Sequence, residues 1–389
     1  MKGADWIRLV ILYGFGMAAA AAMGMLGPLV GDLSSAMRVA VGVAGGALLC
    51  QLLPGSLFGS LIGALIDRAG ARRILLAAGV LLIGVDVAQF FVSGLVWFCI
   101  DLLVQGLAVS AVLSSGQVMV TALAGGVDQI RNLTIWSTVT FVGYAAGLLI
   151  AATSAGSVHW RYAFLLHGAL ISLLPVVGLV LPRVRATVAK TDLLGVLKEV
   201  AVLRLGLALG FASIAGVGTN AGISIYLHRV QGVSLAFSAS MAATGNLLSM
   251  AGSFVVAWLL SRGALPGSLA AGISLVAILC GMVLYHPAAA LPLVIPMLFI
   301  SQSCASAVTA LTYTSLPGKL VDSSKIGAAT GLVVQVSGIG GMLGPPLYFA
   351  VLAGNQWLPI AMTLVLLWGG AFLLMPFRRL PWAPRAEIA

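Results

Sequence analysis

Two aspartates, Asp86 and Asp101, lie well inside long apolar segments of this 389-residue chain, and the other eight acidic residues do not. A carboxylate at the centre of a membrane segment costs about 2.5–3.5 kcal/mol on insertion scales, so such a residue is a functional candidate wherever it occurs. The chemistry open to a buried carboxyl group is reversible proton binding. Two carboxyl groups in one buried site can share protons and titrate as a pair.

The two aspartates lie on neighbouring apolar runs, 74–95 and 97–124, which are separated by a short turn at residues 93–94. Each aspartate lies a similar number of residues from this turn, so both are expected about 11 Å below the surface at 1.5 Å per helical residue. We therefore predict that the carboxylates face each other as proton-coupling groups. The alternatives are two protonated, hydrogen-bonded structural aspartates, or an Asp101 that reaches out to water.

The composition indicates that the solvent of this chain is lipid. Apolar residues make up 61% and charged residues 8%, with a mean hydropathy of +1.12, whereas soluble domains carry about 25% charged residues. The net charge of +10 comes from basic residues in the segments that flank apolar runs, so it does not indicate a nucleic-acid partner. Each of the four cysteines falls in an apolar run, and no disulfide framework is expected.

Twelve apolar runs are long enough to cross a bilayer, which takes roughly 20 residues. A polar segment at 182–204 separates them into an N-terminal half at 1–181 and a C-terminal half at 205–389, which ends in a short cytoplasmic tail. The predicted spans are 7–30, 39–66, 74–95, 97–124, 133–155, 162–181, 205–227, 237–260, 269–285, 289–316, 326–352 and 358–377.

The distribution of lysine and arginine predicts the orientation of these spans. With the N-terminus inside, the inner segments hold 17 of the 20 basic residues and the outer segments hold Arg38, Arg161 and Arg229. Because basic residues favour the cytoplasmic side, both termini are expected in the cytoplasm.

The two halves show signs of an internal repeat. A shift of 197 residues places Gly143 and Gly147 on Gly340 and Gly344, and it places Gln105 on a second glutamine, Gln302. Alanine and glycine matches are common in such a composition, but several spans agree on nearly one offset. We therefore expect two homologous six-helix halves.

A compact cluster of charges lies between the second and third spans, in the segment Gly63-Ala-Leu-Ile-Asp-Arg-Ala-Gly-Ala-Arg-Arg73. It resembles the signature loop of major facilitator superfamily transporters, roughly G-x-x-x-D-R-x-G-R-R/K. The position after the second glycine, usually basic, is Ala71 here. The residues that carry the resemblance are Gly63, Asp67, Arg68, Gly70, Arg72 and Arg73.

The resemblance implies an all-α integral membrane fold of twelve helices in two halves that expose a central site alternately to either side. It also implies a conformational latch, in which Asp67 pairs with basic groups or with a neighbouring helix end and holds the cytoplasmic side closed. Gly63 would permit close helix approach and Gly70 a tight turn. The alternative is a loop that is basic only because of its side of the membrane, with an incidental aspartate.

Two further motifs bear on the substrate and the direction of transport. Many proton-coupled drug exporters of this superfamily carry an arginine where this chain has Leu102, and no lysine or arginine is expected deep in the membrane. We therefore expect a neutral, cationic or mainly apolar substrate. The segment from Gly340 to Pro345 resembles the G-x-x-x-G-P motif of exporters, although general helix packing would account for it equally well.

In this superfamily the cavity is lined by the first, fourth, seventh and tenth helices, with the second, fifth, eighth and eleventh beside them. Gln105 and Gln302 are the expected principal substrate contacts, and an interhelical hydrogen bond is the alternative role for any such amide. The full set of cavity candidates is Tyr13, Gln105, Trp136, Tyr144, Asn220, Tyr226, Asn246, Gln302, Tyr313 and Gln335.

These observations favour a secondary transporter that exports a small organic molecule by proton antiport. The alternative is an uptake symporter or a facilitator for a small metabolite. We expect a monomer in the bacterial inner membrane, with the bilayer, the substrate and protons as its partners and no nucleic acid. No enzyme motif, cofactor or metal-binding cluster is expected.

Overall fold

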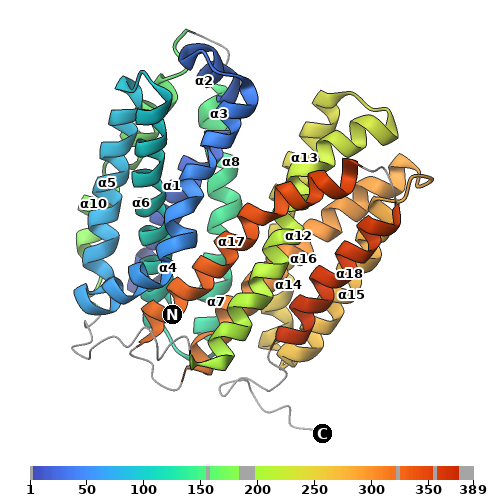
Figure 1. Cartoon of the computed structure of the whole chain (residues 1–389). Coiled ribbons are helices and arrows are strands. Elements are labelled where there is room, and N and C mark those ends of the chain that lie inside the picture. Colours follow the sequence, from blue (N-terminus) through green and yellow to red (C-terminus); the bar gives the residue numbers. More distant parts are fainter. Residues whose placement is uncertain (1–2, 155–157, 184–197, 321–324, 354–356, 376–389) are drawn as a thin grey trace, which may run out of the picture. The chain divides into compact units, whose positions relative to one another are not determined.

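The computed structural model describes residues 3–154, 158–183, 198–320, 325–353 and 357–375, and the described chain is helical (Figure 1). The α-helices are α1 (Gly3–Gly24), α2 (Val30–Met37), α3 (Val41–Ala47), α4 (Leu49–Ala69), α5 (Ala71–Phe91), α6 (Leu95–Leu123), α7 (Gly126–Ser137), α8 (Val139–Ala152), α9 (Tyr162–Ile171), α10 (Leu174–Val177), α12 (Val200–Gln231), α13 (Leu235–Leu248), α14 (Met250–Ser261), α15 (Pro266–Leu284), α16 (Leu291–Ser315), α17 (Ile326–Ala353) and α18 (Trp357–Leu374). Two short 3₁₀ turns, η1 (Gly178–Val180) and η2 (Pro317–Lys319), complete the described elements.

Within the described residues, twelve helical segments are long and apolar enough to cross a membrane, and they correspond one to one with the predicted spans. The prediction of a twelve-helix membrane protein is therefore confirmed. Helices suit this solvent because each satisfies its backbone hydrogen bonds internally, which lipid cannot do. Large apolar side chains on the helix surfaces remain exposed, as in Leu149 (71%) and Leu366 (68%), which fits a lipid environment.

The chain forms two compact units that are not separated by a single cut. Unit 1 comprises residues 1–125, 139–196 and 322–335, and unit 2 comprises 126–138, 197–321 and 336–389. The first turns of α17 thus belong to unit 1 and the rest of that helix to unit 2. Most of the predicted linker at 182–204 lies outside the described residues.

In unit 1, α1 packs against α8 and α6, while α5 packs against α6 and α9. Small residues allow these backbones to approach closely. A Cβ atom at Gly143 would lie 2.5 Å from the Met17 carbonyl oxygen, and one at Gly147 would overlap the carbonyl of Ala21. Close contact through glycine is typical of membrane helices, whose association depends on van der Waals packing.

In unit 2, α16 contacts α12, α14 and α15, and α7 packs against α14 and α16. The glycines predicted to match the α8 pair lie on α17 and face α12. A Cβ atom at Gly340 would overlap the backbone of Gly210, and one at Gly344 would lie 2.7 Å from the Ile214 carbonyl oxygen. Pro345 follows inside the same helix.

Candidate functional site

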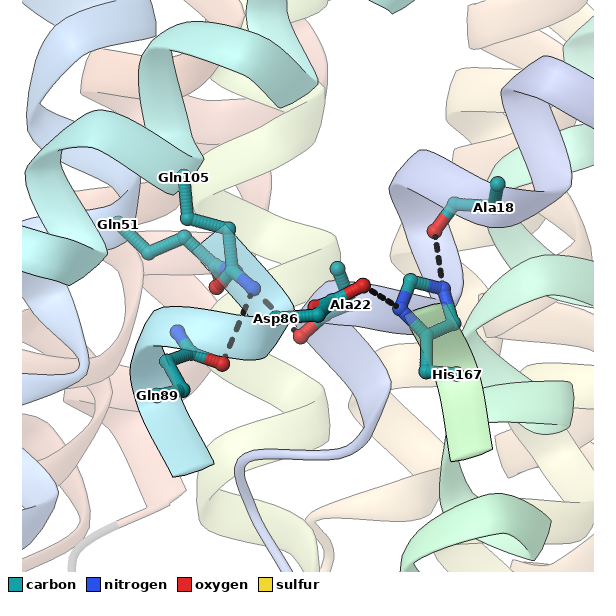
Figure 2. A network of polar contacts seen from close by, with 7 residues as sticks. All are labelled: Ala18, Ala22, Gln51, Asp86, Gln89, Gln105 and His167. Carbon is teal, nitrogen blue, oxygen red and sulfur yellow. Dashed lines mark hydrogen bonds and ion pairs between the residues drawn. The ribbon is translucent and has the colours of Figure 1, made fainter. Parts of the chain in front are cut away.

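The most deeply buried charged group in the described spans is Asp86, on α5, with a relative exposure of 0%. Its Oδ2 atom lies 2.7 Å from Nδ1 of His167, on α9, and the other ring nitrogen, Nε2, lies 3.1 Å from the carbonyl oxygen of Ala18, on α1. Figure 2 shows the imidazole ring between these two oxygens. The arrangement connects three helices through one side chain.

Three glutamines form a chain of amide hydrogen bonds beside this pair (Figure 2). Gln51 of α4 donates to Oε1 of Gln105 on α6 at 2.6 Å, and Gln105 donates to Oε1 of Gln89 on α5 at 3.4 Å. All three side chains are buried. Buried amides require partners, and the Oε1 atoms of Gln105 and Gln89 find theirs within this chain of amides.

The second intramembrane aspartate, Asp101, lies near Gln89 and within electrostatic reach of Asp86. The short contact of Asp86 is made with His167 rather than with Asp101. Asp101 also borders a surface groove of about 410 Å³ between the ends of α5 and α6, which Phe91 and Trp97 line. The two aspartates are therefore neighbours with different surroundings: one is sealed in the helix bundle and the other lies beside a groove.

Asp67, at the end of α4, binds the start of α17. Its two carboxylate oxygens accept hydrogen bonds from the backbone N–H groups of Gly327, at 2.9 Å, and Ala328, at 2.8 Å. These amides belong to the first turn of α17, where N–H groups have no partner within the helix. A carboxylate at this position also interacts favourably with the positive end of the helix dipole.

The two helices meet here through glycine backbones. A Cβ atom at Gly63 would overlap the carbonyl of Gly327, and one at Gly331 would overlap the carbonyl of Gly59. Gln335 adds polar contacts further along α17: it accepts from the backbone N–H of Ser60 and donates to the carbonyl of Leu57, both at 3.1 Å. The start of α17 is thus attached to α4 by backbone contacts and side-chain hydrogen bonds.

The remaining residues of the signature loop occupy the turn into α5. Gly70 lies between the two helices and has a φ of +92°. Residues other than glycine adopt this backbone conformation only at a cost in free energy. Arg72 donates to the carbonyl of Leu179, while Arg68 and Arg73 are exposed.

A second amide cluster lies in unit 2. Gln302 of α16 donates to Oδ1 of Asn220 on α12, and Asn220 donates to Asn246 on α13 at 3.5 Å. Gln105 and Gln302, which the sequence repeat relates, therefore each lie in an amide cluster of their own unit. Interhelical hydrogen bonding, the alternative role considered for them, is present at both positions.

Three tyrosines of unit 2 pack edge to face. Tyr226 of α12 and Tyr285, which follows α15, have ring centroids 5.0 Å apart, and Tyr285 and Tyr348 of α17 have centroids 6.3 Å apart. All three rings are buried. Of these three, only Tyr226 is among the predicted cavity residues.

The other predicted cavity residues are distributed over both units. Tyr13 on α1 and Tyr144 on α8 are half-buried in unit 1. In unit 2, Trp136 on α7 is buried and Tyr313 on α16 is half-buried. These residues stay candidates for substrate contact.

His167 is the functional candidate that sequence reasoning missed, because a lone histidine in an apolar run has many structural roles. Its signal was present: it is an ionisable residue inside a predicted span, as the two aspartates are. In the part of the chain that the structure describes, no group of three or more His, Cys, Asp or Glu side chains could hold a metal ion.

The twelve helices of the described residues that could span a membrane, with buried polar clusters inside two helical units, define a polytopic membrane protein. The model of the Major Facilitator Superfamily matches residues 12–345, and the chain belongs to this family. No curated protein sequence is significantly similar to it.

Solved structures share the fold over nearly the whole chain. The human organic anion transporter MFSD10 (TETRAN) has a TM-score of 0.78 at 16% identity, over 95% of this chain and 99% of its own. The proton:xylose symporter XylE has a TM-score of 0.75 at 12% identity, over 96% and 94%. A bacterial homolog of the human lysosomal transporter Spinster, inward-facing and unoccupied, has 0.65 at 16% identity, over 96% and 97%. At these identities the likeness shows the fold.

Proposed function

We propose that this transporter exports a small organic molecule across the bacterial inner membrane in exchange for protons. The observation that carries the proposal is the pair of carboxyl groups, Asp86 and Asp101, buried within the spans of unit 1 at exposures of 0% and 9%. Ionisable residues in that position are costly and mark ion pathways by default. Coupling requires that proton and substrate favour different conformations.

The chemistry of the interior supports a neutral, cationic or mainly apolar substrate. Amides and tyrosines supply the polar groups of both units, at Gln105, Asn220, Gln302 and Tyr226. Lysine and arginine lie toward the ends of the described spans rather than in their centres. An anionic substrate would find little opposite charge in these clusters.

The contact of Asp67 with the first turn of α17 supports the proposed latch. Two charge-assisted hydrogen bonds and a glycine interface hold the start of α17 on α4. We propose that this attachment persists in the state closed to the cytoplasm and is lost in the other state. Arg68, Arg72 and Arg73 hold the turn on the cytoplasmic side.

The test uses proteoliposomes with a pH-sensitive dye in the lumen and two added probes, the cation ethidium and the neutral molecule chloramphenicol. An antiporter makes the lumen of acid-loaded vesicles more alkaline when a probe is added outside. A symporter acidifies the lumen, and a facilitator moves the probe without a pH change. Acidification would replace export with the alternative, uptake by symport, and probe movement without a pH change would remove the proton from the mechanism.

A further inference from the structure

We propose that Asp86 and His167 together bind one proton and that, while they hold it, they fasten α5 and α9 to α1. This inference rests on the proposed proton coupling and deepens it: of the two intramembrane carboxyl groups, Asp86 shares its proton with an imidazole.

The hydrogen-bond partners of the imidazole determine its proton content. Nε2 lies 3.1 Å from the carbonyl oxygen of Ala18, and a carbonyl oxygen only accepts, so Nε2 carries a hydrogen. Nδ1 lies 2.7 Å from Oδ2 of Asp86. A nitrogen lone pair facing a carboxylate oxygen at this distance would be repelled, so a second proton lies between them.

Two forms satisfy this count. Either an imidazolium donates to a carboxylate, or a carboxylic acid donates to a neutral imidazole that keeps its hydrogen on Nε2. Both forms have no net charge, and both hold one proton more than the pair of an anionic Asp86 and a neutral His167. The site therefore binds one proton whichever atom carries it.

Loss of the proton breaks the bridge. The deprotonated pair would place a net negative charge in a site where the side chains are 0% and 1% exposed. If the imidazole then moved its remaining hydrogen to Nδ1 to satisfy Asp86, Nε2 would present a lone pair to the carbonyl of Ala18. Either contact, with α5 or with α1, must therefore open when the proton leaves.

The packing around the pair leaves little freedom for another arrangement. A Cβ atom at Gly168, next to His167, would lie 3.3 Å from the Cβ atom of Asp86, so α9 meets α5 closely at this point. Also on α5, a Cβ atom at Gly79 would lie 2.6 Å from the ring of Phe15 on α1. The three helices form one tightly packed group around the imidazole.

Asp101 is the titratable neighbour that the charge of Asp86 reaches. It provides a matched control for the histidine NMR signals alone, because it is a carboxylate of the same helical hairpin whereas the imidazole contact is made by Asp86. The other titratable side chains of the packed helices are Asp5, Arg8 and Tyr13 on α1, Cys50, Asp67 and Arg68 on α4, Arg72 and Arg73 on α5, Cys99 on α6, Tyr144 on α8 and Tyr162 on α9.

The first experiment measures the protonation of His167 directly in the full-length protein. Histidine labelled with ¹⁵N is incorporated into protein in lipid nanodiscs, and the His167 signals are assigned by their loss in His167→Gln. We expect a protonated Nε2 and an Nδ1 that shares a proton. Asp86→Asn should shift Nδ1 toward the signal of a nitrogen with a free lone pair, whereas Asp101→Asn should leave both signals in place.

Two results would overturn the proposal: an Nε2 without hydrogen in the wild type, or an Nδ1 signal that is the same in the wild type and in Asp86→Asn. The wild-type spectrum does not depend on the folding of any variant. Gly168→Ala provides a second perturbation, and it should weaken the shared-proton signal by separating α9 from α5.

The second experiment follows proton-driven transport of ethidium in the proteoliposomes. Asp86→Asn and His167→Gln should each lower proton-driven transport at least tenfold while ethidium exchange in the absence of a gradient continues. The exposed control His159→Gln should retain transport. Retained proton-driven transport in His167→Gln would refute the coupling role. A shared proton by NMR without proton movement for any probe would support the proton site and contradict the proposed function instead.

Discussion

Replacing Asp67 tests what holds the start of α17 on unit 1. In Asp67→Ala the backbone N–H groups of Gly327 and Ala328 lose their acceptors, which lie at 2.9 and 2.8 Å. As first-turn amides they have no acceptor within α17. The attachment of this turn to α4 should therefore weaken, although the glycine contacts beside it remain.

The magnitude follows from the two bonds. A buried donor left without a partner costs about 1–3 kcal/mol. Water can reach a helix end once it opens, so we take the lower end for each amide, which gives about 2 kcal/mol in total, or about 30-fold in the equilibrium for local opening. Asp67→Asn keeps one acceptor oxygen and loses the other, which on the same scale costs about 1 kcal/mol, or about fivefold, while the lost charge is common to both variants.

Hydrogen exchange with mass spectrometry measures this opening in a peptide that covers the first turn of α17. The expected order of exchange rates is Asp67→Ala fastest, Asp67→Asn intermediate and wild type slowest. Asp128→Asn is the matched control, because its exposed ion pair with Arg131 has both side chains 44% exposed and should contribute little. Equal protection of the peptide in Asp67→Ala and wild type would refute the reasoning.

Three further predictions concern packing and binding. Gly147→Ala places a methyl group on the carbonyl of Ala21 and should lower the free energy of unfolding by about 1–3 kcal/mol, measured by thermal unfolding. The control Gly84→Ala, whose added Cβ would have no atom within 4 Å, should leave the stability unchanged. Gly70→Ala forces alanine to adopt a positive φ and should lower the free energy of unfolding by about 1–2 kcal/mol in the same assay. Gly94→Ala should not have this effect, because the φ of Gly94 is −137°. Gln302→Ala leaves Oδ1 of Asn220 without its donor and should raise the KM for a transported probe about fivefold or more. The control Thr363→Ala, which removes only a hydrogen bond to Pro359 within the same helix, should leave the KM unchanged. An unchanged KM in Gln302→Ala would assign this amide to packing alone.

The membrane fold could be predicted from the sequence because its determinants are local. Each span needs only a length and an apolar composition, and both are visible in a single window of the chain. The turn at Gly70 and the close packing of Gly147 were also predictable, since larger residues fit such positions only at a cost in strain or in helix separation.

The partners of the site residues could not be predicted in the same way. Asp67 binds backbone amides about 260 positions away. Every residue except proline has such an amide, so residue type does not indicate which amides Asp67 binds. The depth of Asp86 in the membrane follows from its distance to the hairpin turn, but depth does not predict which way its side chain points. The side chain contacts His167 because α9 packs against α5.

The glycine contact between α4 and α17 has a kinetic consequence. At Gly59, Gly63, Gly327 and Gly331 the two helices touch largely through their backbones, and the side chains of Asp67 and Gln335 lie beside this contact. Backbone surfaces of this kind can part and meet again with few rotamer changes, so little side-chain unpacking opposes the motion. The rate of separation is then governed by the breaking of the hydrogen bonds around this contact, and it should respond to charge at Asp67 far more than to side-chain volume elsewhere on the two helices.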